Sequence, residues 1–174
     1  SGNKVNFNQP GRNSLALNKI FQGDPSRIFG SVSANGQIYL INQNGILFGK
    51  DSQVNVGALV ASSLAIDPEA ESGGILNPAL LRQGKAAFQG DGRVYVIDAS
   101  GQIVTGADGQ PVPVKVVVEE GAKITASAGG GGSVALIGQQ VENAGTIESP
   151  SGQVILAAGQ KVYLQASESP DLRG

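Results

Sequence analysis

The side chains that most often carry out enzymatic or metal chemistry are scarce in this 174-residue sequence. It contains no His, Cys, Met or Trp, so a Ser-His-Asp triad, a Cys-His pair and a zinc site of His and Cys ligands are excluded. Asp67, Glu69 and Glu71 lie close together, and carboxylate oxygens are calcium ligands. Their spacing matches no calcium loop, so we expect a solvated acidic loop and no cofactor.

The remaining charges also argue against catalysis and against nucleic-acid binding. Glu119 and Glu120 are adjacent, so on a strand they point to opposite faces and cannot act as an acid/base pair. The sequence has 12 basic and 14 acidic residues, a net charge of -2, and the basic residues are scattered. Nucleic-acid-binding domains usually cluster Lys and Arg. We therefore predict a non-enzymatic domain with no nucleic-acid partner.

The elements that must position these residues are short strands in a repeated pattern. Apolar runs of three to five residues are separated by glycine or Asn-Gly, which is typical of β-strands and turns. A Gly-x-β-β-β pattern recurs at residues 36–40, 132–136 and 152–156, and the last two copies start 20 residues apart. This period predicts an all-β parallel β-helix, with a β-sandwich as the alternative. We expect these residues to point into the tube: Val134, Leu136, Ile147, Val154 and Leu156.

Two segments interrupt the period. Residues 67–90 contain two prolines and a helix candidate at 78–83 with Asn77 as its N-cap, and we expect an extra-helical loop there. Residues 91–118 predict a β-hairpin insertion, with strands at 93–98 and 111–118 and a turn at 106–109. We expect residues 1–174 to form one domain that carries both segments.

Several motifs follow one another in a fixed order, at residues 5–10, 17–20, 24–30, 33–49 and 54–64 and again at 132–137, 141–147 and 152–160. These motifs resemble the filamentous-haemagglutinin-type TPS domain, the two-partner-secretion domain of Gram-negative exoproteins. The resemblance covers residues 4–66 and 119–165, and the order of the motifs is specific to this family. Asn42, Gln43, Asn44 and Gly45 match a secretion-linked Asn-Pro-Asn-Gly motif, with Gln43 where proline is usual. Further family-motif positions are Gln9, Pro10 and Asn18.

The resemblance implies a right-handed parallel β-helix and a role in secretion. Family members are large adhesins, haemolysins and contact-dependent toxins. Their TPS domain is recognised in the periplasm by the POTRA domains of a dedicated outer-membrane transporter, and the exoprotein then folds at the cell surface. The absence of cysteine suits a chain that crosses a narrow pore unfolded. We expect a secreted or cell-surface protein that reaches its destination through the periplasm.

Three expectations remain open at this point. The family's domain usually begins upstream of the equivalent of Val5, so we expect the N-terminal cap and first coils to be missing here. The alternative function is a polysaccharide-binding or polysaccharide-cleaving β-helix, which needs Asp, Arg or Lys clustered on one outer sheet. A third class is an adhesin segment, in which the full-length protein binds a host or matrix ligand directly.

Overall fold

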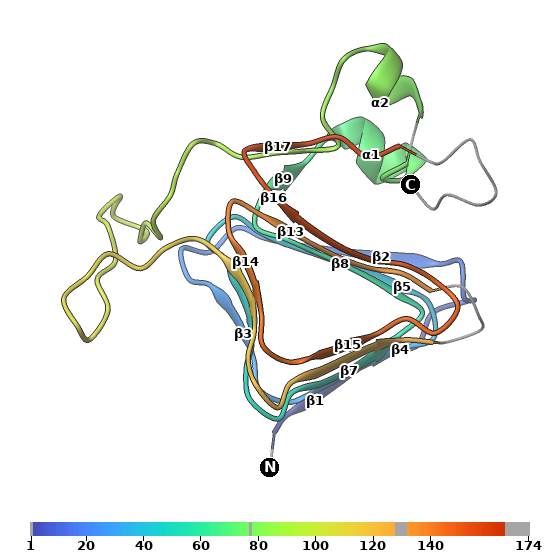
Figure 1. Cartoon of the computed structure of the whole chain (residues 1–174), viewed down its shortest axis with the longest axis horizontal. Helices are drawn as coiled ribbons and strands as arrows, with labels where there is room; N and C mark the ends of the chain where they lie inside the picture. Colours follow the sequence, from blue (N-terminus) through green and yellow to red (C-terminus); the bar gives the residue numbers. More distant parts are fainter. Residues whose placement is uncertain (1, 77, 128–131, 166–174) are drawn as a thin grey trace.

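The computed structural model describes residues 2–76, 78–127 and 132–165, and its main body is a three-sided tube of parallel strands (Figure 1). Each of the first four coils adds one strand to each of three sheets, which we call sheets A, B and C, and the fifth coil adds one to sheet A and one to sheet B. Sheet A contains β1 (Lys4–Phe7), β4 (Ser31–Ala34), β7 (Gln53–Val56), β12 (Lys123–Ala126) and β15 (Thr146–Glu148). Sheet B contains β2 (Leu15–Ile20), β5 (Gln37–Asn42), β8 (Ala58–Ser62), β13 (Val134–Gly138) and β16 (Val154–Ala158). Sheet C contains β3 (Ser26–Ile28), β6 (Ile46–Phe48), β11 (Val116–Val118) and β14 (Val141–Asn143).

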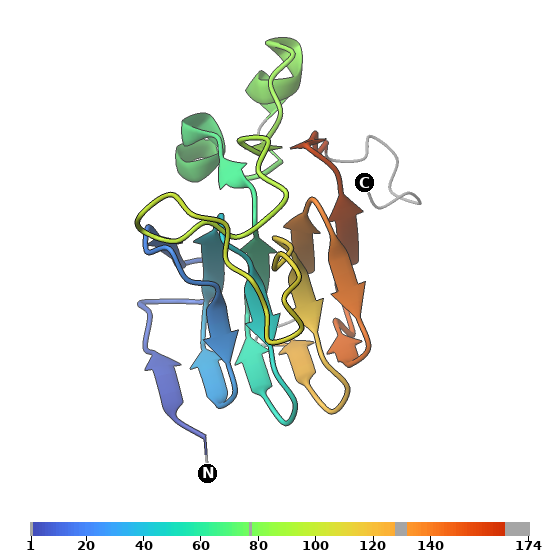
Figure 2. The ribbon, with the colours of Figure 1, turned by 90° about the vertical axis from the view of Figure 1, so that its left-hand side faces the viewer.

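This arrangement confirms the predicted parallel β-helix. The coils stack one on another, and Figure 2 shows their strands side by side from the N-terminal coil (blue) to the last coil (red). The register places like residues in columns, for example Val54 beside Ile124 and Ile124 beside Ile147. The tube interior is a core of aliphatic side chains with one buried phenylalanine ring, Phe48. Burial of these apolar faces is the main force that holds the coils together.

Glycine occupies the corner that precedes each sheet-B strand from coil 2 onward. A Cβ atom on Gly36 would lie 2.6 Å from the Ser14 carbonyl oxygen, and one on Gly57 would lie 2.6 Å from the Gly36 carbonyl oxygen. The Gly57 N–H donates a 2.8 Å hydrogen bond to that same Gly36 carbonyl. Gly132 and Gly152 continue the column. The repeated glycine of the sequence is therefore explained by close backbone contact between coils.

The predicted inward residues differ in burial between the last coil and the coil before it. Val134 and Leu136 are fully buried, and Ile147 is half-buried against the same core. Val154 pairs with Val134, and Leu156 with Leu136, so both share the inward face, yet they are 43% and 51% exposed. Their predicted inward direction agrees with this register. They are exposed because β16 is the last strand of sheet B in the described part of the chain, and no further described strand stacks on it.

A second core lies outside the tube, on the outer face of sheet B. After β8 the chain leaves the coil through β9 (Ala65–Ile66), α1 (Pro68–Gly73), α2 (Pro78–Arg82) and β10 (Phe88–Gln89). β10 pairs antiparallel with β9 and with β17 (Lys161–Val162), which follows the last coil, and these strands form sheet D. Together they bury Tyr39, and desolvation raises the pKa of its hydroxyl.

The segment expected as a loop thus contains two short helices. The helix predicted at 78–83 is confirmed as α2, whereas Asn77, its expected N-cap, lies outside the described residues. None of the helices in the described ranges is long and apolar enough to cross a membrane.

The second excursion, residues 91–115, which we call the insertion, contains three short segments. The two outer segments pair antiparallel at Tyr95 and Pro113, in the manner of the expected hairpin. The middle segment pairs with both outer segments, so the prediction of a two-stranded hairpin was incomplete. Three valines eight residues apart close a cycle of backbone hydrogen bonds, in which Val96 donates to Val112, Val112 to Val104 and Val104 to Val96, over 2.8–2.9 Å. The predicted strand 111–118 is split, because its last three residues form β11 of the tube.

Candidate functional site: the corner motif and its neighbours

The motif Asn42, Gln43, Asn44 and Gly45 forms the turn from β5 to β6, where coil 2 passes from sheet B to sheet C. Asn42 Oδ1 accepts a hydrogen bond from the Asn44 N–H over 2.9 Å, and the Gly45 N–H donates to the Asn42 carbonyl over 2.9 Å. Gly45 has a φ of 105°, and a Cβ atom there would lie 2.8 Å from the Lys115 carbonyl oxygen. Glycine is therefore required at this position on two separate grounds.

The two asparagine side chains tie this corner to coil 1. Asn42 Nδ2 donates to the Asp24 carbonyl and to Ser26 Oγ, both over 3.0 Å. Asn44 Nδ2 donates to the Gln22 carbonyl over 2.8 Å. Both side chains are buried, and Gln43 between them is half-buried. The asparagines therefore act on their surroundings by fixing the backbone of residues 22–26.

Arg93 connects the same corner to the insertion, and no motif in the sequence predicted this contact. Its Nη1 donates to Asn44 Oδ1 over 3.3 Å, and its Nε lies 2.5 Å from Asp91 Oδ2 in an ion pair. Its carbonyl accepts a hydrogen bond from the side chain of Gln139 in coil 4. Asn44 thus contacts Gln22 of coil 1 through its amide nitrogen and Arg93 of the insertion through its amide oxygen.

Gln9 fastens a different corner, where coils 1 and 2 pass from sheet A to sheet B. Its Nε2 donates to the carbonyls of Ser14 (2.8 Å) and Gln37 (3.0 Å), and its Oε1 accepts from the Gly36 N–H (3.0 Å). Asn35 exchanges two 2.7 Å hydrogen bonds with the Gln9 backbone. Pro10 follows at the exposed surface. The glutamine amide therefore adds to the backbone hydrogen bond from the Gln37 N–H to the Ser14 carbonyl, and its Oε1 accepts from Gly36 where the Gly36 carbonyl accepts from Gly57 in the next coil.

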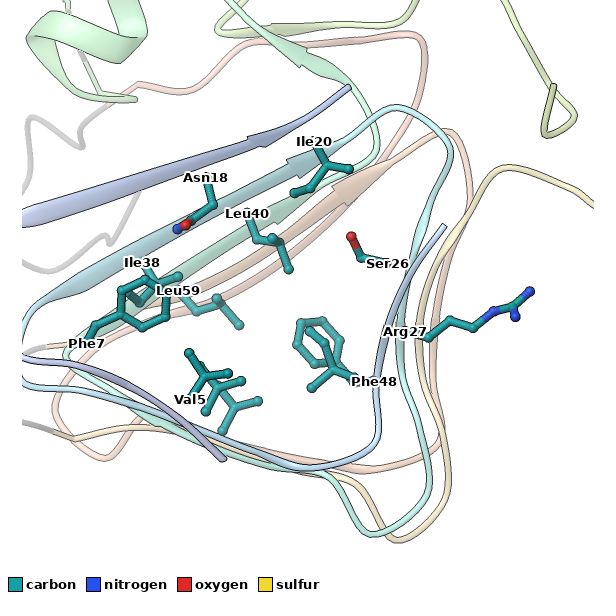
Figure 3. A pocket seen from close by; sticks show the side chains of 13 residues that line it. Val5, Phe7, Asn18, Ile20, Ser26, Arg27, Ile38, Leu40, Phe48 and Leu59 are labelled. Atoms are coloured by element: carbon teal, nitrogen blue, oxygen red, sulfur yellow. The ribbon is translucent and has the colours of Figure 1, made fainter. Parts of the chain in front are cut away.

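Asn18 lies at the open N-terminal end of the tube, on β2. Its Nδ2 donates to the carbonyls of Ala16 and Tyr39, over 3.2 and 3.3 Å. It lines an apolar hollow of about 390 Å³ formed by the first three coils. Figure 3 shows Val5, Leu40 and Phe48 pointing into this hollow, whereas Arg27 points away from it.

The structure does not bring together the residues of the family motif. Asn42–Gly45 lie at one corner, Gln9 and Pro10 at another, and Asn18 on the strand between them. Four of them, Gln9, Asn18, Asn42 and Asn44, share one property, which is that their side-chain amides join the first two coils. Hydrogen bonds of this kind satisfy buried backbone groups and fix the stacking of the coils.

The acidic residues of the first excursion hold its helices in place. Asp67 Oδ1 caps α1 by accepting from the Glu69 N–H over 2.9 Å. Glu69 pairs with Lys85 over 3.0 Å, and this contact raises the pKa of the lysine. Glu71 pairs with Lys19 of β2. Within the described ranges no three His, Cys, Asp or Glu side chains are grouped to hold a metal ion.

Comparison with known proteins agrees with the fold and with the family resemblance. The family model for the TPS secretion domain matches residues 1–173. A heme/hemopexin-binding protein of Haemophilus influenzae strain KW20 is 30% identical over 167 residues, which is 95% of this chain and 16% of the relative. Another heme/hemopexin-binding protein of Haemophilus influenzae is 33% identical over 69 residues, which is 40% of this chain and 7% of the relative. The chain therefore spans less than a fifth of the length of these relatives. It belongs to the TPS secretion domain family, the domain of exoproteins exported by two-partner secretion.

Proposed function

We propose that this chain is the secretion module of a large exoprotein and that it is recognised by the POTRA domains of a cognate outer-membrane transporter. Recognition takes place in the periplasm, before the exoprotein is exported to the cell surface. The observation that carries the proposal is the match of the TPS secretion domain to residues 1–173. The module acts by binding, without a catalytic step.

The corner motif supports this role because it gives the coil surface a fixed shape. Asn42 and Asn44 use their amides on coil 1, and Gly45 allows the turn to contact Lys115. A partner that binds here meets a preorganised backbone, and preorganisation lowers the entropy cost of binding.

We also propose that the domain nucleates β-helix folding of the exoprotein. Val154 and Leu156 present inward-facing apolar side chains that no strand of the described residues covers, and β16 is an edge strand of sheet B there, with one side available for backbone pairing. An uncovered coil of this kind is a template, because stacking the next coil buries these side chains and pairs the edge. Repeat architectures fold by such nearest-neighbour addition.

The heme and hemopexin binding stated in the relatives' names is not part of the function proposed for this domain. Heme iron in proteins is held by His, Cys, Met or Tyr, and this sequence has none of the first three. Of its tyrosines, Tyr39 is buried under the helices, whereas Tyr95 and Tyr163 are exposed. We assign no heme or hemopexin binding to this chain from the names of its relatives.

Recognition is tested by immobilising the POTRA domains of the cognate transporter and measuring binding of the purified chain. We expect saturable binding, with little binding to POTRA domains of an unrelated transporter as the control. A chain with native circular dichroism that does not bind the cognate domains would contradict the proposal.

The templating role is tested with Leu156→Asp. In this chain the substitution is expected to preserve the fold, since Leu156 is 51% exposed. In a longer segment of the exoprotein it should slow refolding, because a carboxylate would be buried when the next coil stacks. The control is Ser151→Asp at the exposed corner of the same coil. Equal refolding rates for the two variants would refute the templating role.

A further inference from the structure

A groove runs along the corner motif between two walls that come from distant parts of the sequence. One wall is the loop of coil 1 from Phe21 to Asp24, and the other is the insertion at Ile97–Ala99. Gln43, Asn44 and Arg93 form the floor, and the groove has a volume of about 790 Å³. We call it the corner groove. In Figure 1 the insertion projects from the side of the tube formed by sheet C.

Asn44 sets the distance between the two walls. Its Nδ2 donates to the Gln22 carbonyl in one wall over 2.8 Å, and its Oδ1 accepts from Arg93 at the base of the other over 3.3 Å. The walls also approach directly, because a Cβ atom on Gly23 would lie 3.1 Å from the Ala99 nitrogen. The motif residue is therefore a positioning residue for the groove, and this explains how a buried asparagine can influence an external partner.

The groove has an apolar anchor point. The ring of Phe21 is 89% exposed, and Ile20 and Ile97 beside it are half-buried in the groove lining. Single exposed apolar residues are common on protein surfaces. An exposed aromatic ring next to a preformed groove is instead the arrangement that interface hot spots use.

The groove also carries negative charge. Asp24 and Asp98 are exposed in its lining. Hydrogen bonds from the side chain of Ser100 and the backbone of Gln102 lower the pKa of Asp98, so its carboxylate stays ionised. The one cation of the lining, Arg93, is paired with Asp91 over 2.5 Å. Charge complementarity therefore favours a cationic occupant.

We propose that the corner groove docks a basic segment of the transporter's periplasmic part, with an apolar side chain of that segment packed on Phe21 and Lys or Arg side chains beside Asp24 and Asp98. This inference rests on the proposed function, and it names the surface and the chemistry by which the transporter recognises the domain. Asn44 and Arg93 lie under the bound segment and hold the two walls.

The test measures binding of single variants to the immobilised POTRA domains at low and at high salt. We expect Phe21→Ala to weaken binding about tenfold, as for an aromatic hot spot. Asp24→Asn and Asp98→Asn should slow association and reduce the salt dependence, because the amide keeps an acceptor oxygen and removes the charge.

Two matched controls lie outside the groove. Phe29→Ala removes another exposed ring, 55% exposed, and Asp108→Asn changes a carboxylate that accepts from Gln110 in the next turn of the insertion. Both should bind like the unaltered chain. If the groove variants also bind like the unaltered chain, the groove is not the docking site, although the proposed function stands. If the unaltered chain does not bind, the proposed function fails and the groove assignment fails with it.

Discussion

Leu136 and Leu156 are paired residues on the inner face of adjacent coils, and replacing each with alanine tests how burial stabilises the tube. Leu136 is fully buried, so its truncation leaves a cavity and should cost about 2–5 kcal/mol. Leu156 is 51% exposed. Full burial of a leucine contributes about 1.5–3 kcal/mol, so the truncation of this half-buried leucine should lower the free energy of unfolding by about 1 kcal/mol.

Urea unfolding followed by circular dichroism measures both variants against the unaltered chain. The midpoint should fall clearly for Leu136→Ala and only slightly for Leu156→Ala, with unchanged slopes. Equal losses would refute the argument, since they would mean that Leu156 is covered in solution. A larger loss for Leu156→Ala would refute the register itself.

Three further outcomes are expected. Gly57→Ala should lower the melting temperature, because its Cβ would lie 2.6 Å from a carbonyl oxygen, whereas Gly11→Ala, with nothing within 4 Å, should not. Asn42→Ala should cost about 1–3 kcal/mol in urea unfolding by leaving buried partners unsatisfied, and a secretion defect larger than this loss explains would indicate a role in recognition. Asp98 should titrate by NMR below the range of an ordinary aspartate. Because its pKa is lowered on folding, its contribution to stability is present above the unfolded pKa and is lost as pH falls through the folded one.

The repeated strands could be predicted because the tube depends on a local pattern. Each coil needs a glycine at the corner and alternating inward residues, and both are visible in the sequence around Gly36 and Gly152. The outer core could not be predicted in this way. Tyr39 lies on an outward-facing position of β5, and it is buried only because α1, α2 and β10 fold back over it.

Only part of the site could be predicted, again because local patterns are visible in the sequence and contacts between distant residues are not. The corner turn at Asn42–Gly45 follows from local turn chemistry. The contact between Asn44 and Arg93 joins residues 49 positions apart, and no local pattern encodes it. The three-segment insertion did carry a signal, the eight-residue spacing of Val96, Val104 and Val112, which the hairpin prediction left unused.

The point where the chain leaves the third coil and returns to it has a consequence for how such domains diversify. Gly138 is close to Ser63, where the first excursion begins, and to Val116, where the insertion rejoins the tube, since a Cβ atom on it would lie 2.6 Å from Ser63 Oγ and 3.4 Å from Val116 Cγ2. Because these two points are near each other, the segment between them can change length at small entropic cost, whereas one extra residue inside a strand would turn the inward side chains that follow it outward. This corner is therefore the natural place to graft a foreign segment into the domain, and lineages can exchange surface loops there while the stacked coils stay the same.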